Sequence, residues 1–289
     1  MPPTTVADLQ TLKRTRRGIV MITAYDYVSA RVAAAAGVDI VLVGDSAANT
    51  VLGYSSTREV SLAEMLVLTA AVRRGLDAER ATGASRPLLV GDMPFGTYEP
   101  SDGAAVETAE KFAAVGCDAV KLEGGGGSIA RVRAIVGAGI PVMGHVGLLP
   151  QQLAAGAPRA QGRTAGEALA IAQDARDLEH AGCFAIVLEA IPAAVSAVVV
   201  PTLLVPAIGI GAGPATDGQV LVFHDVVGLT DGKTPRFVKR YARLLPEMVD
   251  AVRAFASDVR EGRYPSAEHE YGMDEQELAR LRSSLSGDG

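Results

Sequence analysis

Eight short apolar runs, most of them separated by alanine-rich segments of helical length, constrain the fold of this chain more than any other feature. Apolar runs that alternate with helical segments predict parallel strands that are covered on both faces. Eight such strands predict closure into a (β/α)8 TIM barrel, an α/β fold. The expected strands are residues 19–26, 39–45, 87–92, 119–123, 141–146, 184–189, 203–209 and 220–224.

Domain organisation follows from the same pattern. A chain of 289 residues would suggest about two average domains, but a barrel uses roughly 250 residues as a single unit. Beyond Pro246, the apolar residues Val249, Val252 and Phe255 recur at helical spacing. We therefore predict one barrel domain over residues 1–289. Its helical extension, about 246–282, is expected to pack on the barrel or on a neighbouring subunit, and a short disordered tail follows.

Acidic residues close four of the expected strands, namely Asp45, Asp92, Glu123 and Glu189. A buried ion is unfavourable unless another charge or a metal compensates for the water that it loses. The carboxyl ends of barrel strands meet on one face, where barrel enzymes place their chemistry, so we expect one shared site. Any single carboxylate could instead be a helix N-cap or half of an ion pair. Four in a repeated context favour a metal enzyme.

Three of these carboxylates, Asp45, Asp92 and Glu123, are hard oxygen ligands, which suit Mg²⁺ better than zinc. Lys121 lies two residues before Glu123, so strand periodicity points both side chains to the barrel interior. This lysine has two open interpretations. It could neutralise a carboxylate in a structural ion pair, or it could bind a substrate carboxylate or a developing enolate oxygen.

Glu189 is the candidate general base, because its strand carries no other ionisable group and its carboxylate could take a proton from carbon. His145 also stands at a strand end and could be a second acid or base. A lone histidine more often makes a structural hydrogen bond than takes part in catalysis, so a purely structural role stays open for His145.

Composition excludes several classes of function. The net charge is −6, and no segment is basic enough to predict binding to nucleic acid. The two cysteines, Cys117 and Cys183, match no zinc spacing and are expected to be buried, reduced thiols at strand starts. The N-terminus lacks the apolar core of a signal peptide, which favours a cytoplasmic protein.

Residues 190–216 carry no charge and are long enough to cross a bilayer. Pro192, Pro201 and Pro206 interrupt the segment, so a single membrane-spanning helix is not expected. We predict a buried helix followed by a buried strand, and no association with a membrane.

Long motifs over nearly the whole chain resemble those of the ketopantoate hydroxymethyltransferase family, also called 3-methyl-2-oxobutanoate hydroxymethyltransferases. They are MITAYDYVSA (21–30), VLVGDSAANTVLGYSST (41–57), GDMPFGTY (91–98), AVKLEGG (119–125), PVMGHVGLLPQ (141–151), GIGAGPATDGQVLVFHDVVGL (209–229) and PRFVK (235–239). Residues 156–163 and 195–204 depart from the family's pattern, and the tail after Glu270 is longer than expected.

The resemblance implies a barrel of the phosphoenolpyruvate/pyruvate type that makes ketopantoate from 3-methyl-2-oxobutanoate in pantothenate biosynthesis. It implies Mg²⁺ held by Asp45, Asp92 and Glu123, keto acid held at that site by Ser46 and Lys121, and Glu189 as general base. The implied one-carbon donor is 5,10-methylenetetrahydrofolate, and the implied assembly is a homo-decamer.

Two other functions remain as alternatives from the sequence. The first is a Mg²⁺-dependent keto-acid lyase on the same barrel, but such lyases carry a reactive cysteine on a mobile loop, and neither cysteine here is so placed. The second is a non-catalytic barrel that binds keto acid and metal. Such a protein would not need Glu189.

Overall fold

The computed structural model describes residues 3–152, 159–232 and 234–287. The chain divides into two compact units, Met1–Ala242 and Arg243–Gly289. Part of the divergent segment 156–163, residues 156–158, lies outside the described residues. The boundary at residue 243 lies close to the start that we predict for the helical extension. The single-domain organisation stays a prediction.

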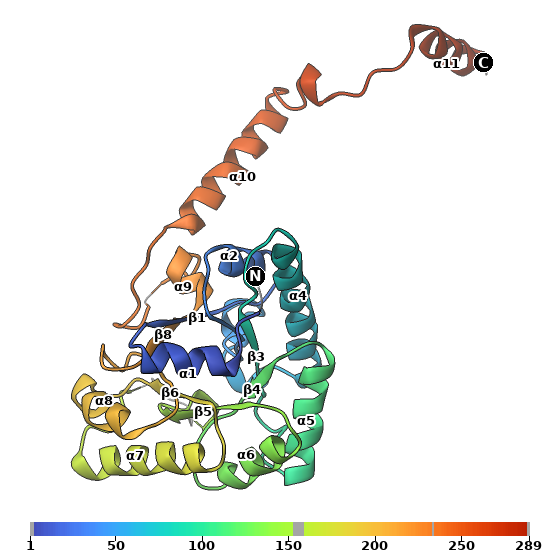
Figure 1. The fold of residues 1–289 in the computed structure, drawn as a ribbon. Helices are drawn as coiled ribbons and strands as arrows, with labels where there is room; N and C mark the ends of the chain where they lie inside the picture. The colour runs from blue at the N-terminus through green and yellow to red at the C-terminus, as the bar shows by residue number, and fades with distance from the viewer. Residues whose placement is uncertain (1–2, 153–158, 233, 288–289) are drawn as a thin grey trace. The chain divides into compact units, whose positions relative to one another are not determined.

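The first unit contains a closed barrel whose described strands are all parallel to their neighbours, as the sequence predicts (Figure 1). Each strand pairs with the next one along the chain, and the last pairs with the first. The strands are β1 (Ile19–Thr23), β2 (Ile40–Val43), β3 (Leu88–Asp92), β4 (Ala119–Lys121), β5 (Val142–Gly147), β6 (Ala185–Glu189), β7 (Ala207–Ile210) and β8 (Gly218–Leu221).

The predicted strands 19–26, 39–45 and 119–123 end earlier in the structure, at Thr23, Val43 and Lys121, and two further strands are shifted. The expected strand 203–209 is confined to β7, because Pro206 has no N–H for the ladder and Val200–Thr202 forms a 3₁₀ turn, η3. The expected strand 220–224 begins and ends earlier, as β8. The N–H of Phe223 donates to Thr23 Oγ1, and the chain then enters helix α9.

Helices surround the barrel and follow most of its strands (Figure 1). Side-chain caps fix several of their starts, with capping boxes at Thr5, Asp26, Ser61 and Thr164. The helices of the first unit are α1 (Val6–Arg14), α2 (Tyr27–Ala35), α3 (Ala47–Thr50), α4 (Leu62–Ala81), α5 (Asp102–Ala114), α6 (Ser128–Gly137), α7 (Ala165–His180), α8 (Ala193–Val199) and α9 (Phe223–Val227). Short 3₁₀ turns lie at η1 (Thr57–Glu59) and η2 (Pro150–Gln152).

The second unit is helical, with α10 (Leu244–Arg260), a 3₁₀ turn η4 (Ala267–His269) and α11 (Glu275–Ser286). One side of α10 presents apolar residues at helical spacing, and these residues are exposed in the single chain. They are Met248, Val249, Val252, Phe255 and Val259.

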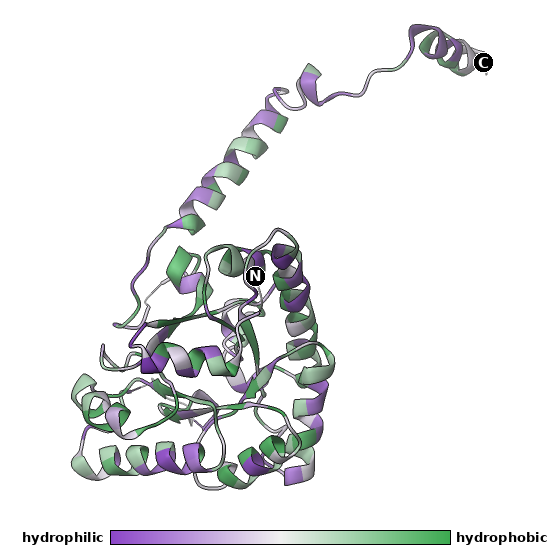
Figure 2. Cartoon of the chain, in the orientation of Figure 1, coloured by the Kyte–Doolittle hydropathy of each residue, from purple (hydrophilic) through white to green (hydrophobic). Residues whose placement is uncertain are grey.

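Apolar side chains alternate between two buried layers along the barrel strands. In β2, Ile40 and Leu42 pack inside the barrel, whereas Val41 and Val43 pack outward against the helices. Figure 2 shows the hydrophobic colour concentrated on the strands, while helices such as α7 also carry hydrophilic stretches. Both faces of these strands are therefore covered, as expected for a parallel sheet.

Within the described ranges, no helix is long and apolar enough to cross a membrane. The uncharged segment 190–216 instead forms α8, η3 and β7. Our prediction of a buried helix there is wrong in part, because Val198 is 72% exposed and only Ser196 and Val199 of α8 are buried. The strand that follows is largely buried, as predicted.

Candidate active site

The side chains predicted to act together line a single cavity of about 120 Å³ at the carboxyl ends of the strands. Neighbouring strands and the loops that follow them supply these side chains, and the register Asp92↔Lys121 sets two of them side by side. The predicted residues that line the cavity are Asp45, Ser46, Asp92, Lys121, Glu123, His145 and Glu189.

Lys121 and Asp92 form a buried ion pair, with 2.7 Å between Lys121 Nζ and Asp92 Oδ1 and side-chain exposures of 5% and 2%. Burial opposes the charged form of Lys121, but the carboxylates of Asp92, Glu123 and Asp45 outweigh it and raise the pKa. The ammonium therefore stays charged. The ion pair that the sequence left open is present, and its lysine also lines the cavity.

Asp45 and Asp92 lie close together in the same buried region. The backbone N–H of Asp45 donates to Asp92 Oδ2 at 3.2 Å. Burial raises the pKa of Asp45 to about 8, and the like charge of Asp92 adds to this effect. Burial also raises the pKa of Asp92, against the opposing influence of Lys121. Two carboxylates crowded in this way are stabilised as anions when a cation joins them.

His145 lies between two carboxylates, with Nδ1 3.4 Å from Glu123 Oε1 and Nε2 3.3 Å from Glu189 Oε2. Burial acts to lower the pKa of His145, but the neighbouring carboxylates of Glu123 and Glu189 raise it to about 9. Glu189 is therefore the only ionisable residue of its own strand, but it has an ionisable neighbour on the next one. The neighbouring strand β5 places an imidazole beside it, because His145 pairs with Val187 in the register of β5 and β6.

Sequence reasoning missed two buried residues of this site, Tyr98 and Gln151. The Gln151 amide donates to Asp45 Oδ2 at 2.9 Å, and its backbone N–H donates to Glu123 Oε2 at 3.0 Å. The Tyr98 hydroxyl donates to Gln151 Oε1 at 2.7 Å. Tyr98 and Gln151 are the last residues of two motifs that carry the family resemblance, GDMPFGTY and PVMGHVGLLPQ. Their place in these motifs is the sequence signal that could have identified them.

The donor set fits Mg²⁺ on two grounds. Asp45, Asp92 and Glu123 are buried carboxylates, and a divalent cation among them would relieve the burial and crowding that raise the pKa values of Asp45 and Asp92. Glu123 Oε1 is buried and makes no hydrogen bond within residues 3–152, 159–232 and 234–287, although His145 Nδ1 lies 3.4 Å from it.

The carboxylates are not arranged as a closed cage. Over the described parts of the chain, no three side chains of His, Cys, Asp and Glu converge closely enough to ligate one ion directly. Mg²⁺ retains several waters and takes only one or two protein carboxylates, so an open, oxygen-rich cavity is compatible with its preferences.

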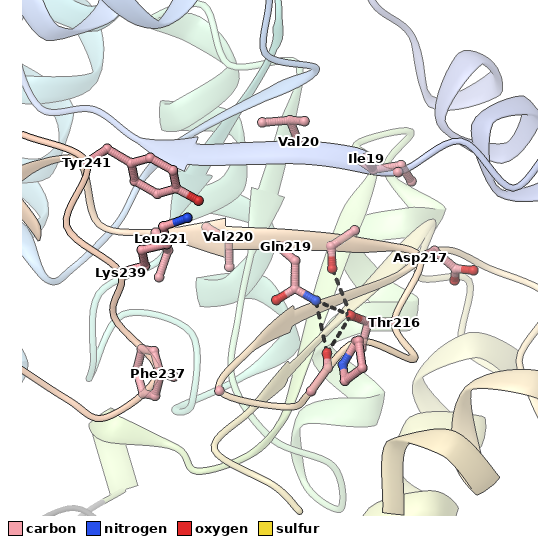
Figure 3. Close-up of a pocket in the computed structure, with 15 residues that line it drawn as sticks. Ile19, Val20, Thr216, Asp217, Gln219, Val220, Leu221, Phe237, Lys239 and Tyr241 are labelled. Carbon is pink, nitrogen blue, oxygen red and sulfur yellow. Dashed lines mark hydrogen bonds between the residues drawn. The ribbon is translucent and has the colours of Figure 1, made fainter. Parts of the chain in front are cut away.

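A larger cavity of about 640 Å³ lies elsewhere on the barrel, along β1 and β8 and the segments 211–217 and 237–241 (Figure 3). The charged side chains that line it are Asp217 and Lys239, and Asp217 is already paired with Lys13 at 2.7 Å. Thr216 and Gln219 hydrogen-bond to each other there. None of the predicted site residues lines this cavity, so its size does not make it the chemical site.

The cysteines lie away from the cavity, as expected. Cys183 is buried and Cys117 is half-buried, and each precedes a strand. Burial raises the pKa of Cys183 to about 12 and also raises that of Cys117. Neither thiol therefore has the thiolate character of a reactive nucleophile.

The model of the family described as Ketopantoate hydroxymethyltransferase matches residues 3–267 of this chain. The chain belongs to that family. Its activity is accordingly that of a ketopantoate hydroxymethyltransferase in pantothenate biosynthesis. The family predicted from the sequence motifs is confirmed, and the lyase and the non-catalytic barrel are set aside.

Relatives named 3-methyl-2-oxobutanoate hydroxymethyltransferase match over nearly their full length. The one from Oleidesulfovibrio alaskensis is 51% identical over 285 residues, which cover 98% of this chain and 96% of that relative. The one from Acidothermus cellulolyticus is 51% identical over 269 residues, with coverages of 92% and 96%.

Solved structures of lower sequence identity share the fold. 2,3-Dimethylmalate lyase, described as a member of the PEP mutase/isocitrate lyase superfamily, gives a TM-score of 0.56 at 19% identity, over 99% of this chain and 98% of that one. Phosphonopyruvate hydrolase in complex with oxalate and Mg²⁺ gives a TM-score of 0.58 at 14% identity, with 98% of each chain covered. These likenesses agree with the barrel fold that the sequence predicts.

Gly147, at the end of β5, offers a test of how tightly Glu189 is held. Its φ is +95°, and a Cβ added there would clash with the backbone oxygen of Glu189. We expect Gly147→Ala to destabilise the fold by about 1–3 kcal/mol through backbone strain and to lower activity, because relief of the clash moves Glu189. Urea unfolding and turnover measure the two effects. Gly166→Ala, on a helix with open space around it, is the control and should be neutral or stabilising.

Proposed function

We propose that the 120 Å³ cavity is where 3-methyl-2-oxobutanoate loses its C3 proton before the one-carbon unit is added. The observation that carries this proposal is the meeting of a carboxylate, Glu189, and a buried cation, Lys121, in one cavity rich in further carboxylates. A carbon acid next to a ketone needs both a base at the carbon and positive charge near the carbonyl oxygen.

Glu189 is proposed as the general base. Its side chain is 19% exposed, so it borders the cavity without being sealed from it. When it takes the C3 proton, negative charge shifts to the keto oxygen of the substrate. His145 is proposed as its auxiliary, since Nε2 lies 3.3 Å from Glu189 Oε2 and holds that carboxylate against β5.

Lys121 and Ser46 are proposed to bind the keto acid. The Lys121 ammonium is fixed by Asp92 and faces the cavity, where it can attract the substrate carboxylate or the oxygen that gains charge. Ser46 Oγ lies 2.7 Å from the hydroxyl of Tyr25, which sets its direction from the loop after β2. A low-dielectric cavity strengthens these interactions.

We propose that Asp45, Asp92 and Glu123 hold Mg²⁺, in part through water molecules. Asp45 and Asp92 are also proposed to contact the bound keto acid. When bound, the ion would supply Lewis-acid polarisation of the α-keto acid. The crowding of these buried carboxylates, which raises the pKa of Asp45, and the lack of a hydrogen bond from any described residue to Glu123 Oε1 support this assignment.

The proposed one-carbon donor is 5,10-methylenetetrahydrofolate. C3 of the keto acid forms a bond to the methylene carbon, both C–N bonds of that carbon break, and water supplies the hydroxyl group of ketopantoate. In the overall balance, the two folate nitrogens gain the C3 proton and the remaining proton of water. The decisive assay combines purified protein, 3-methyl-2-oxobutanoate and methylenetetrahydrofolate, and it follows ketopantoate by mass spectrometry with Mg²⁺ or with EDTA. Ketopantoate formed equally well in EDTA, or absent when both substrates and Mg²⁺ are supplied, would contradict the proposal.

We also propose a homo-oligomer, with a decamer as the expected size. The exposed apolar stripe of α10, which includes Val252 and Phe255, supports contact with further copies. Light scattering coupled to size-exclusion chromatography measures the mass directly, and a monomer at micromolar concentration would contradict this part.

A further inference from the structure

Gln151 occupies a position that the reaction itself does not explain. It lies in the 3₁₀ turn η2 (Pro150–Gln152) and is fully buried, with 0% of its surface exposed. A buried primary amide must satisfy two N–H donors and a carbonyl oxygen, so burying one is unfavourable unless its surroundings supply partners.

Every polar position of the Gln151 side chain has a partner. Nε2 donates to Asp45 Oδ2 at 2.9 Å and to the backbone oxygen of Met93 at 3.1 Å, while Oε1 accepts from the hydroxyl of Tyr98. The carbonyl oxygen of Met93 can only accept, so the amide atom that faces it must be nitrogen. That contact fixes the orientation of the amide, and the carboxylate of Asp45 consequently receives an N–H.

Tyr98 strengthens this assignment. The backbone N–H of Glu123 lies 3.4 Å from the Tyr98 oxygen and donates to it, so the hydroxyl proton is free to go to Gln151 Oε1 at 2.7 Å. The chain Glu123 N–H, Tyr98 O–H and Gln151 amide therefore runs in a single direction and ends on Asp45 Oδ2.

Gln151 also engages the other side of the carboxylate cluster. Its backbone N–H donates to Glu123 Oε2 at 3.0 Å. One residue thus holds one oxygen of Asp45 and one oxygen of Glu123, from the loops after β2 and β4. The opposite oxygen of Glu123, Oε1, makes no hydrogen bond to the described residues, and His145 Nδ1 lies 3.4 Å from it.

We propose that Gln151 is a positioning residue that orients Asp45 and Glu123 so that their remaining oxygens are directed toward the divalent cation. This inference rests on the proposed Mg²⁺ site. Residues that hydrogen-bond to metal ligands fix ligand orientation, and their loss typically weakens metal affinity by about 10- to 100-fold.

Binding of Mn²⁺, used as a paramagnetic probe, to the metal-stripped full-length protein tests the inference without any turnover. Gln151→Met keeps the length of the side chain and the backbone N–H but removes the amide. We expect its Mn²⁺ affinity, measured by electron paramagnetic resonance, to fall by about 10- to 100-fold. Gln173→Met is the matched control. It also removes a hydrogen bond from a glutamine amide to an aspartate, Asp177, but on the exposed face of α7. It should bind Mn²⁺ like the parent.

Tyr98→Phe gives a second test that perturbs the core less. It removes the hydroxyl that fixes Gln151 Oε1. The Mn²⁺ affinity should fall by roughly 2- to 10-fold, which corresponds to the free energy of one neutral hydrogen bond. In turnover assays, the Mg²⁺ concentration for half-maximal rate should rise in both variants. The rate at saturating Mg²⁺ should recover toward that of the parent, which a merely structural defect would not allow.

Asp45→Asn separates failure of this inference from failure of the metal site. If Asp45→Asn loses Mn²⁺ while Gln151→Met and Tyr98→Phe retain parental affinity, the positioning role is wrong and the ligand set stands. If Asp45→Asn also binds like the parent, the ligand set itself is wrong. Should Gln151→Met fail to fold, the result for Tyr98→Phe decides.

Discussion

Glu189→Gln is expected to bind 3-methyl-2-oxobutanoate and to lose turnover by about 10²- to 10⁴-fold, the usual effect of removing a positioned general base. The amide keeps the shape of the side chain beside His145 but cannot accept the C3 proton. Steady-state rates with methylenetetrahydrofolate measure the loss, and calorimetric titration with the keto acid measures binding.

Exchange of the C3 hydrogen in D₂O without folate isolates the same step, and Glu189→Gln should abolish it. Glu167→Gln is the matched control, because Glu167 caps the start of α7 rather than lining the cavity. It should exchange at the parental rate. Parental exchange by Glu189→Gln would contradict the assignment of the base and favour His145 in its place.

Lys121→Ala and Lys121→Arg should both lower turnover severely, although for different reasons. The alanine leaves Asp92 buried without its partner, and breaking a buried ion pair typically destabilises a protein by about 3–5 kcal/mol. The arginine keeps the charge, but a planar guanidinium does not fit the place of a compact ammonium that is 5% exposed. Urea unfolding and turnover should be measured together on each variant.

The two measurements on Lys121 distinguish its structural and catalytic roles. We expect turnover to fall in the folded population of both variants by more than the loss of folded protein explains. Lys111→Arg, at the exposed pair with Glu107, is the control and should be close to parental in both respects. Near-parental turnover in Lys121→Ala or Lys121→Arg would leave Lys121 with only the structural role.

The sequence predicts the barrel and the meeting of the carboxylates for one physical reason. Parallel strands bring their carboxyl ends to one face, so Asp92 at the end of β3 and Lys121 at the end of β4 become neighbours whatever the loops do. A strand's own composition does not reveal which residues face it from the next strand. The position of His145 beside Glu189 therefore depends on the β5–β6 register, which only the structure provides.

Other features depend on contacts between segments far apart in the chain. Gln151 reaches Asp45 across 106 positions, and Phe223 is held by Thr23 across 200. No local pattern encodes such pairings. The end of β8 differs from the prediction for the same reason, whereas the start of β7 depends on the local effects of Pro206 and the 3₁₀ turn Val200–Thr202.

The most direct test of the central claim, that one metal-dependent cavity removes the C3 proton, is proton NMR of 3-methyl-2-oxobutanoate in D₂O with metal-stripped protein and no folate. We expect loss of the C3 proton signal after Mg²⁺ is added, and no loss in excess EDTA. Equal exchange in EDTA and in Mg²⁺ would contradict it.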